Sequence, residues 1–327
     1  MVLRSPSICR SSWKVGRVFC HFPNIWLIAL AGLVFGLVPA THLHAQALGW
    51  EGETGVFVTP LAYTASAEGQ KIHPVVAYHY FNAGPVIGEF HEVSTEVGLG
   101  NRLELGYTHE FHIEGGDPSL SPLWQNGFEI FNGKLILVPE NFKKNTAIPA
   151  ISVGFIALTG VRNVGDYLAY NNSTNNGMNN GDIYIVASKV VTQVSKKVPI
   201  VLNAGVRGTN AELWGMGGNA PNWQARPFGA VAFVFTGPRR STIIFGSEAA
   251  MQPHHPLGFT SLSDTGKLPL NIPTTLTYCT RIVPSPKHKL NIDFGVAQVA
   301  GMIYGSGSTG INLKARHQFG AQMTYGF

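Results

Sequence analysis

Residues 313–327 read Leu-Lys-Ala-Arg-His-Gln-Phe-Gly-Ala-Gln-Met-Thr-Tyr-Gly-Phe. Successive side chains of a β-strand point to opposite faces, so a strand with one oily face shows apolar residues at every second position. Near-unbroken alternation over this length predicts a strand rather than a helix. The first face carries Leu313, Ala315, His317, Phe319, Ala321, Met323, Tyr325 and Phe327, and the other carries Lys314, Arg316, Gln318, Gly320, Gln322, Thr324 and Gly326.

The same alternation recurs upstream, in segments of roughly ten residues. At 102–112, Leu103, Leu105 and Tyr107 alternate with charged or polar residues, and residues 289–299 repeat the pattern. Less regular segments lie at 75–81, 90–98, 128–138, 150–157, 182–193, 199–207, 226–236, 241–251 and 273–283. The chain therefore contains twelve candidate strands between residues 75 and 327.

The connections between these segments alternate between short and long. The short ones are 100–101, 195–198, 237–240 and 284–288; the long ones are 113–127, 158–181, 208–225, 252–272 and 301–312, with 139–149 intermediate. Bacterial outer-membrane barrels have short periplasmic turns, longer external loops and an even number of strands. The sequence thus predicts an all-β protein, a closed antiparallel transmembrane β-barrel of about twelve strands, or fourteen if two strands have been merged.

The physical reason for closure is that lipid offers no hydrogen-bond partners to an open sheet edge. The outward apolar side chains of such a barrel would meet outer-membrane lipid. Aromatic residues near strand ends suit the interfacial girdles of such barrels. The candidates are Trp124, Trp223, Tyr278, Tyr304 and Tyr325.

Composition and charge argue against a helical protein and against a nucleic-acid-binding protein. Charged residues make up 13% of the chain, and 38 glycines and 20 prolines are spread along it, which disfavours long helices. The net charge is +5, but four of the 23 Lys and Arg residues (Arg4, Arg10, Lys14 and Arg17) lie near the N-terminus. The other 19 Lys and Arg residues are nearly balanced by 18 Asp and Glu residues. The sequence therefore has no excess of basic residues that would predict nucleic-acid binding.

The N-terminal region has the layout of a secretion signal. Its basic residues precede an apolar run at 25–38, and Ala45-Gln46-Ala47 is a small-x-small cleavage site. We therefore expect residues 1–47 to be a signal peptide and the mature protein to reside in the bacterial outer membrane. Cys9 and Cys20 would be removed with the signal, leaving Cys279 without a disulfide partner in the chain.

Residues 48–74 stand apart from the predicted wall at 75–327. Gly55–Tyr63 is strand-like, but counting it would give an odd number of strands. We therefore interpret 48–74 as an N-terminal lead-in or plug.

Charged residues of both signs fall on the side of the strands that should face the lumen. They either form a constriction that selects small solutes, or pair with one another in a filled, plugged lumen. Asp293 and Arg316 are the expected pair, because their strands are consecutive. The lumen candidates are Glu92, Glu96, Glu104, Glu110, Arg207, Glu248, Arg281, Asp293, Lys314 and Arg316.

We find no motif for catalysis, for a metal or for a cofactor. Adjacent His254 and His255 would point apart on an extended chain and have no carboxylate cluster around them. His109, His112 and Ser119 could supply a base and a nucleophile, yet no recognisable motif joins them. The sequence thus predicts a protein that is not an enzyme.

Several blocks of sequence resemble an uncharacterised bacterial family, a domain of unknown function whose members are expected to be outer-membrane barrels. The resemblance begins at Gly49-Trp50-Glu51-Gly52 with Gly55-Val56-Phe57-Val58-Thr59-Pro60-Leu61-Ala62-Tyr63 and covers roughly residues 48–327. Further blocks lie at 203–210, 213–221, 272–278 and 294–301. The resemblance implies the barrel fold and brings no substrate or catalytic residue. The Gly-x-x-x-Thr-Pro opening is also similar, over a short stretch, to outer-membrane proteins of exopolysaccharide export.

The end of the last strand is similar to the signal by which barrel-assembly machinery recognises its clients, with Ala321, Met323, Tyr325 and Phe327 at two-residue steps. Three functions stay open. The first is a channel for passive or facilitated passage of small solutes, whose identity the sequence does not reveal. The second is a non-conducting structural or envelope-assembly barrel, and the third is a membrane-embedded lipid hydrolase.

Overall fold

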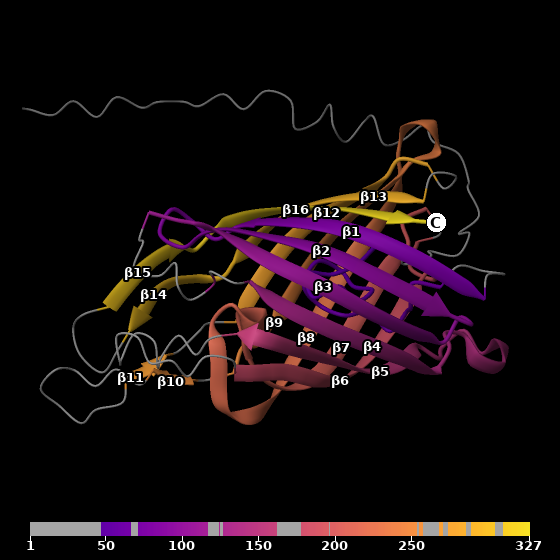
Figure 1. Cartoon of the computed structure of the whole chain (residues 1–327). Helices are drawn as coiled ribbons and strands as arrows, with labels where there is room; N and C mark the ends of the chain where they lie inside the picture. The colour runs from indigo at the N-terminus through magenta and orange to yellow at the C-terminus, as the bar shows by residue number, and fades with distance from the viewer. Residues whose placement is uncertain are drawn as a thin grey trace, which may run out of the picture. The chain divides into compact units, whose positions relative to one another are not determined.

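Twelve strands of the computed structural model close into one antiparallel barrel (Figure 1). The structure describes residues 47–66, 71–116, 124, 127–161, 178–195, 197–253, 255–257, 268–270, 274–285, 289–304 and 310–327. Apart from Ala47, the expected signal peptide at 1–47 lies outside these residues. The all-β barrel predicted from the alternation is confirmed, and its strand number is twelve rather than fourteen.

Each predicted segment corresponds to one strand of the wall. The wall strands are β1 (Ile72–Asn82), β2 (Gly88–Leu99), β3 (Leu103–Glu114), β4 (Phe128–Val138), β5 (Ala150–Val161), β6 (Met178–Val191), β7 (Ile200–Glu212), β8 (Gly218–Thr236), β9 (Thr242–Ala250), β12 (Thr275–Val283), β13 (Leu290–Gln298) and β16 (Gln318–Gly326). Two further pairs, β10 (His255–Leu257) with β11 (Leu268–Leu270) and β14 (Ala300–Tyr304) with β15 (Gly310–Ala315), form separate two-stranded sheets. Short 3-10 turns are η2 (Phe142–Lys144), η3 (Leu213–Gly215) and η4 (Pro238–Arg240).

The first and last wall strands close the ring. Tyr78 of β1 lies opposite Val93 of β2 on one side and opposite Met323 of β16 on the other. Each wall strand therefore has two hydrogen-bonded neighbours, which leaves no sheet edge in need of a partner.

Alternating burial gives the wall two distinct faces. On β3, Leu105 and Tyr107 are 46% and 39% exposed, whereas Glu104 and Glu110 are fully buried. Because the outward residues are apolar along most wall strands, the barrel carries an oily outer band. A search of the described residues finds no helix with the length and apolar character that membrane crossing requires.

The short connections include a tight hairpin between β2 and β3. Gly100 and Asn101 have φ values of 55° and 58°, the left-handed conformation that a two-residue hairpin turn with the twist of its strands requires. The predicted long loop at 208–225 is wrong. β7 continues to Glu212 and β8 begins at Gly218, so only residues 213–217 connect them. The pairing of the two strands shifts register between Thr209 and Ala211 and resumes next to the connection.

The last predicted strand is interrupted. β16 begins at Gln318, whereas β15 ends at Ala315 and pairs only with β14. The bend at 316–317 separates the two because the hairpin β14–β15 continues as its own sheet. The girdle assignment also needs one correction, since Trp124 is buried and donates to the Met216 carbonyl at 3.0 Å. Trp223, Tyr278 and Tyr325 are exposed, and the side chain of Tyr304 lies outside the described part.

The barrel interior is packed with side chains. A buried apolar cluster occupies the end at which the wall strands meet the long connections, with Phe81 at the end of β1 and Phe90 at the start of β2. Trp214 and Met216 reach this cluster from the connection between β7 and β8. The other part of the interior is polar and contains the residues described next.

Candidate functional site

Residues 47–66, here called the inner segment, run inside the barrel (Figure 1, indigo). Nearly all of them are buried, although the segment forms only the isolated bridges Leu48↔Thr54 and Gly55↔Pro60. A chain without regular sheet pairing must satisfy its buried backbone groups in another way. Turns within the segment satisfy some of these groups, as where the Trp50 N–H donates to the Phe57 carbonyl at 2.9 Å. Inward side chains of the wall provide further partners.

Glu248 of β9 holds the middle of the inner segment. Its carboxylate accepts hydrogen bonds from the backbone N–H groups of Phe57, Val58 and Thr59 at 3.5, 2.9 and 3.0 Å. The Thr59 hydroxyl donates to the same carboxylate at 2.7 Å. One buried side chain thus satisfies three successive backbone donors.

Glu104 and Lys134, on β3 and β4, hold other residues of the inner segment than Glu248 does. The two side chains, on neighbouring strands β3 and β4, form a fully buried ion pair at 2.6 Å. Glu104 accepts from the Thr54 N–H and hydroxyl at 3.1 and 2.7 Å and from the Ala65 N–H at 2.8 Å. Lys134 donates to the carbonyl oxygens of Thr54 and Tyr63 at 2.8 and 3.0 Å. The pair is therefore a bridge between the wall and both arms of the inner segment.

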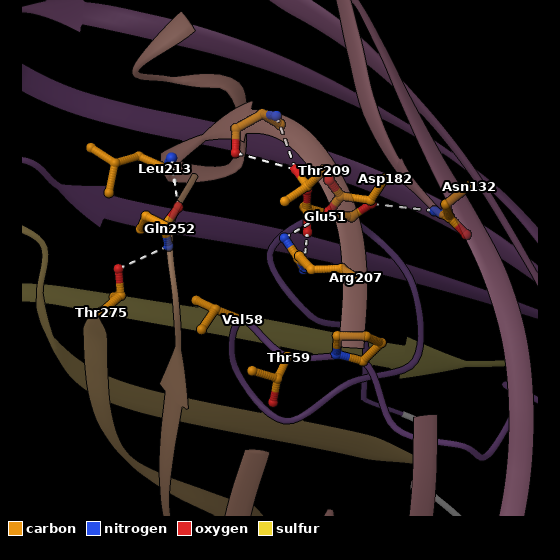
Figure 2. A network of polar contacts seen from close by, with 12 residues as sticks. Glu51, Val58, Thr59, Asn132, Asp182, Arg207, Thr209, Leu213, Gln252 and Thr275 are labelled. Atoms are coloured by element: carbon orange, nitrogen blue, oxygen red, sulfur yellow. Dashed lines mark hydrogen bonds and ion pairs between the residues drawn. The ribbon is translucent and has the colours of Figure 1, made fainter. Parts of the chain in front are cut away.

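Arg207 of β7 joins an acidic residue of the inner segment to one of the wall (Figure 2). Its guanidinium lies 3.0 Å from the Glu51 carboxylate and 2.7 Å from that of Asp182 on β6. Burying charged groups is costly unless they are paired, so the arginine stabilises both carboxylates in the interior. Figure 2 also shows Gln252, which accepts from the Leu213 N–H at 2.9 Å and donates to the Thr275 hydroxyl at 3.0 Å.

Arg281 of β12 pairs with Asp293 of β13, where its Nε lies 2.9 Å from the carboxylate. The same guanidinium donates to the carbonyls of Gly55 and Val56 at 3.2 and 2.5 Å. The expected pair of Asp293 with Arg316 is wrong. Arg316 is exposed at the bend that precedes β16, so it cannot reach the interior.

Neutral polar side chains complete the attachment. Ser188 and Ser152 bond to the N–H and carbonyl of Ala62 at 2.8 and 2.6 Å, and Asn203 donates to the Pro60 carbonyl at 3.0 Å. Gln322 donates to the Leu48 carbonyl at 2.9 Å. Together with His73, which meets the Ala65 carbonyl, the partners come from nine wall strands: β1, β3, β4, β5, β6, β7, β9, β12 and β16.

The wall is also shaped to receive the segment. The ring of Phe57 lies over Gly295 and Gly320, on neighbouring strands β13 and β16. A Cβ atom at Gly320 would come within 2.7 Å of that ring, and one at Gly295 within 3.2 Å. Glycine at these two inward positions therefore leaves the room that the aromatic ring fills.

The ten lumen candidates have three different placements. Eight lie on wall strands with their side chains directed inward and largely buried: Glu92, Glu96, Glu104, Glu110, Arg207, Glu248, Arg281 and Asp293. Arg316 is exposed. Lys314 belongs to β15 outside the wall, and its side chain lies outside the described part.

Sequence reasoning missed Lys134, Asp182 and Glu51. Lys134 lies on β4, where Phe131 and Leu135 face outward as alternation requires. The inward face of β4, however, also carries the apolar residues Phe128, Ile130 and Ile136, so much of both faces is apolar in sequence. The available signal on β4 was a pair of polar residues two positions apart, Asn132 and Lys134, on its inward face.

Buried acidic groups outnumber buried basic groups in the interior. Among the described wall residues, eight carboxylic acids are buried (Glu92, Glu96, Glu104, Glu110, Asp182, Glu212, Glu248 and Asp293), against Lys134, Arg207 and the largely buried Arg281. The inner segment adds Glu51 and Glu53. Burial raises the pKa of the Glu53 carboxyl to about 7, although Lys134 and Arg207 oppose the shift. Burial also raises the pKa of Glu51, against the opposing charge of Arg207.

The catalytic candidates do not form a nucleophile–base pair in the described part. His109 contacts Glu129 at 3.0 Å on the outer face, and Ser119 lies outside the described residues. A different pair does meet: His79 Nε2 lies 3.0 Å from the Ser94 hydroxyl, with its Nδ1 3.1 Å from Gln322. Both residues are fully buried, and Trp50 of the inner segment packs edge-on against the imidazole. Among the described residues, no group of three or more His, Cys, Asp or Glu side chains is arranged to hold a metal ion.

The proposed assembly signal lies on the outer face of β16. Met323, Tyr325 and Phe327 are 52%, 45% and 57% exposed, and Ala321 shares their face. The Phe327 N–H donates to the Pro74 carbonyl at 3.0 Å, which places the chain end beside the start of β1.

Solved structures with a similar course of the chain share little sequence with it. LpxR from Salmonella typhimurium has 11% identity and a TM-score of 0.45, with 77% of this chain and 99% of that one covered. The COG4313 outer membrane channel from Pseudomonas putida F1 has 10% identity and a TM-score of 0.44, with coverage of 80% and 97%. The KdgM porin in complex with disordered oligogalacturonate has 10% identity and a TM-score of 0.41, with coverage of 77% and 99%. No curated protein matches the sequence.

One family model matches residues 47–265, which is more than half of the chain. The match begins with the inner segment and includes seven of the nine wall strands that hold it, from β1 to β9, but not β12 and β16. The chain therefore belongs to the family described as "Protein of unknown function (DUF3034)".

Proposed function

We propose that this protein is a bacterial outer-membrane channel for small solutes that its own inner segment holds closed. In the closed state residues 47–66 occupy the lumen, and solutes pass only when the segment is displaced. The observation that carries the proposal is the attachment of the segment to nine wall strands through inward polar side chains. An interior designed only for rigidity would be expected to use apolar packing, because buried ion pairs contribute little net stability.

The outer-membrane placement rests on the wall itself. Its outward face presents apolar side chains such as Phe155, Ile185 and Phe294, each more than 40% exposed. Such a surface is compatible with acyl chains and unfavourable in water. The proposed partners are therefore membrane lipid and, through Met323, Tyr325 and Phe327, the barrel-assembly machinery.

Conductance in a planar lipid bilayer tests the closure. We expect the mature protein to conduct rarely, and a variant without residues 48–66 to conduct steadily. A second variant, Glu248→Ala, keeps the segment but leaves the N–H groups of Phe57, Val58 and Thr59 without their acceptor. Each unsatisfied buried donor costs about 1–3 kcal/mol, so this variant should open more often than the native protein.

Glu89→Ala is the matched control, because the Glu89 side chain is 39% exposed and bonds to Tyr80 rather than to the inner segment. Its conductance should equal that of the native protein. Each variant is first checked for folding by its altered mobility on gels without heating. Folded protein that lacks residues 48–66 and still does not conduct would contradict the channel and favour the non-conducting structural alternative.

The hydrolase alternative has one supporting contact, between His79 and Ser94. Both residues lie beneath the inner segment, so a lipid substrate would reach them only after its displacement. We propose that the pair is structural and that the protein is not an enzyme. Turnover of phospholipid by the variant without residues 48–66 would contradict this.

A further inference from the structure

Basic residues gather at the end of the barrel where the short connections lie. Lys71 precedes β1, Arg102 ends the turn between β2 and β3, and Lys197 lies between β6 and β7. The other connections at this end contribute Lys143 and Lys144 in η2, Arg239 and Arg240 in η4, and Lys289 before β13. We call these eight residues the basic rim; all are exposed except Lys289, which is half-buried.

Acidic residues do not neutralise the rim. Among the described residues at the end with the short connections, one acidic side chain lies outside the lumen, that of Glu140. It is already paired with Lys189 at 3.1 Å. The seven exposed rim residues form no ion pair with any described residue. Lys289, the eighth member, donates to the Phe327 carbonyl oxygen at the chain end at 2.5 Å. The other seven therefore leave positive charge without an acidic partner around one mouth of the barrel.

Four of the rim residues have a left-handed backbone conformation, in which lysine and arginine are unusual. Lys143 and Lys144 have φ values of 52° and 63°, and Arg239 and Arg240 have 54° and 64°. In this left-handed region glycine is unstrained and asparagine is tolerated, whereas long side chains are disfavoured. Cations thus occupy four positions at which local geometry favours glycine or asparagine, which is consistent with a role for their charge outside the chain.

The rim also lies at the edge of the oily band. The exposed ring of Phe142 sits beside Lys143, whose Nζ is 5.5 Å from the ring centroid. On the neighbouring strand, Leu135 and Leu137 face outward with 42% and 49% exposure. Cations that directly follow an apolar band are at the depth of lipid phosphates in a bilayer.

We propose that the basic rim binds the phosphate headgroups of anionic phospholipids in the leaflet that surrounds the short connections. Such binding fixes the height and tilt of the barrel, because a ring of contacts resists movement in every direction across the membrane. This inference rests on the membrane placement proposed above and is independent of channel activity.

Native mass spectrometry of the mature protein tests the proposal, after its release from micelles with equal amounts of phosphatidylglycerol and phosphatidylethanolamine. We expect preferential retention of phosphatidylglycerol. A variant with Lys143→Gln, Lys144→Gln, Arg239→Gln and Arg240→Gln should lose at least about fivefold of this preference, the effect of about one cation near an anionic lipid surface. Inorganic phosphate at matched ionic strength should not displace the lipid.

Two controls separate charge from structure. Exchanging lysine for arginine and arginine for lysine at the same four positions keeps the charge and should keep the preference. Arg316→Gln removes an exposed cation outside the rim and should change nothing. Equal retention of the two lipids by the native protein, or an unchanged preference in the glutamine variant, would overturn the proposal. So would binding of a soluble anionic polymer without lipid preference. Failure of the folded protein to enter lipid at all would instead overturn the membrane placement.

Discussion

Adjacent residues of the wall lie in environments of opposite character. The Glu104 side chain is fully buried against Lys134, whereas Leu105, the next residue, is 46% exposed on the outer face. Asp293 and Phe294 repeat the arrangement on β13. A substitution therefore has a different effect according to its position along a strand and the face on which it lies.

The outer face should reject charge most strongly at the middle of a strand. Ile185, near the centre of β6, is 51% exposed on that face. We expect Ile185→Arg to reduce the folded fraction strongly, since a cation at mid-bilayer costs about 2–4 kcal/mol in such barrels. The measurement is refolding into lipid vesicles, followed by gel mobility without heating.

Two matched variants test the depth and the face. Leu105→Arg, three residues into the start of β3, should cost less, because the penalty falls towards the interface. Val194→Arg puts the same charge on a 76% exposed residue of a short connection and should be neutral. Equal effects of the three variants would contradict the outward assignment.

At the scale of elements, the inner segment differs from every wall strand in how it is held. Wall strands are joined by continuous backbone ladders, whereas the segment is attached through side chains such as Glu248 and Lys134. Losing these contacts would leave the ladders of the wall intact. The proposed displacement would therefore leave the hydrogen-bonded ring of the wall in place.

Displacement should depend on pH through Glu53. Burial raises its pKa to about 7 in the closed state, from an ordinary value of 4.5. The closed state thus binds the proton more tightly, so closure is favoured below pH 4.5 and weakens as the pH rises towards 7. Each unit of pKa difference corresponds to about a tenfold change in the equilibrium.

We therefore expect bilayer conductance of the mature protein to increase between pH 5 and pH 8, and Glu53→Gln to reduce this dependence. Glu51 of the same segment, whose pKa burial also raises, should account for part of what remains. The other charged groups that act on Glu53 are Lys134, Arg207 and Glu104. A pH dependence that persists unchanged in Glu53→Gln would contradict the role of Glu53 and assign the effect to Glu51 or to the wall instead.

At the scale of the whole molecule, acidic and basic residues lie in different regions, although the net charge is small. In the part of the wall that the structure describes, eight buried carboxylic acids lie against three basic residues, while the seven exposed cations of the basic rim form no ion pair with a described residue. The near-neutral sum of the mature sequence hides both features. An opened lumen would consequently carry an excess of acidic groups.

We expect the variant without residues 48–66 to prefer cations. Acidic rings favour cations in pores, so a potassium chloride gradient across the bilayer should give a reversal potential of the cation-selective sign. The preference should decrease in the same variant with Glu92→Gln and Glu110→Gln, two buried residues that face each other on β2 and β3. An anion-selective current would contradict the charge argument.

The sequence alone determined the wall. Each wall strand has one face towards the outside and one towards the interior. Alternation of apolar and polar residues therefore predicts the strand, as at 102–112 and at the end of β16. The signal weakened where the interior itself is apolar, as on β4 with Ile130 and Ile136. At the last strand, alternation continued across the bend at 316–317 and overestimated the strand.

Only the tertiary structure decided what the inward residues do. Asp293 meets Arg281 rather than Arg316, and Glu248 meets backbone groups about 190 positions away in sequence. Such contacts depend on the register of twelve strands and on the path of a segment without regular pairing. Neither of these produces a periodic pattern of residues in the sequence. Periodicity records which solvent a side chain faces, whereas the identity of its partner is fixed only when the barrel closes around the inner segment.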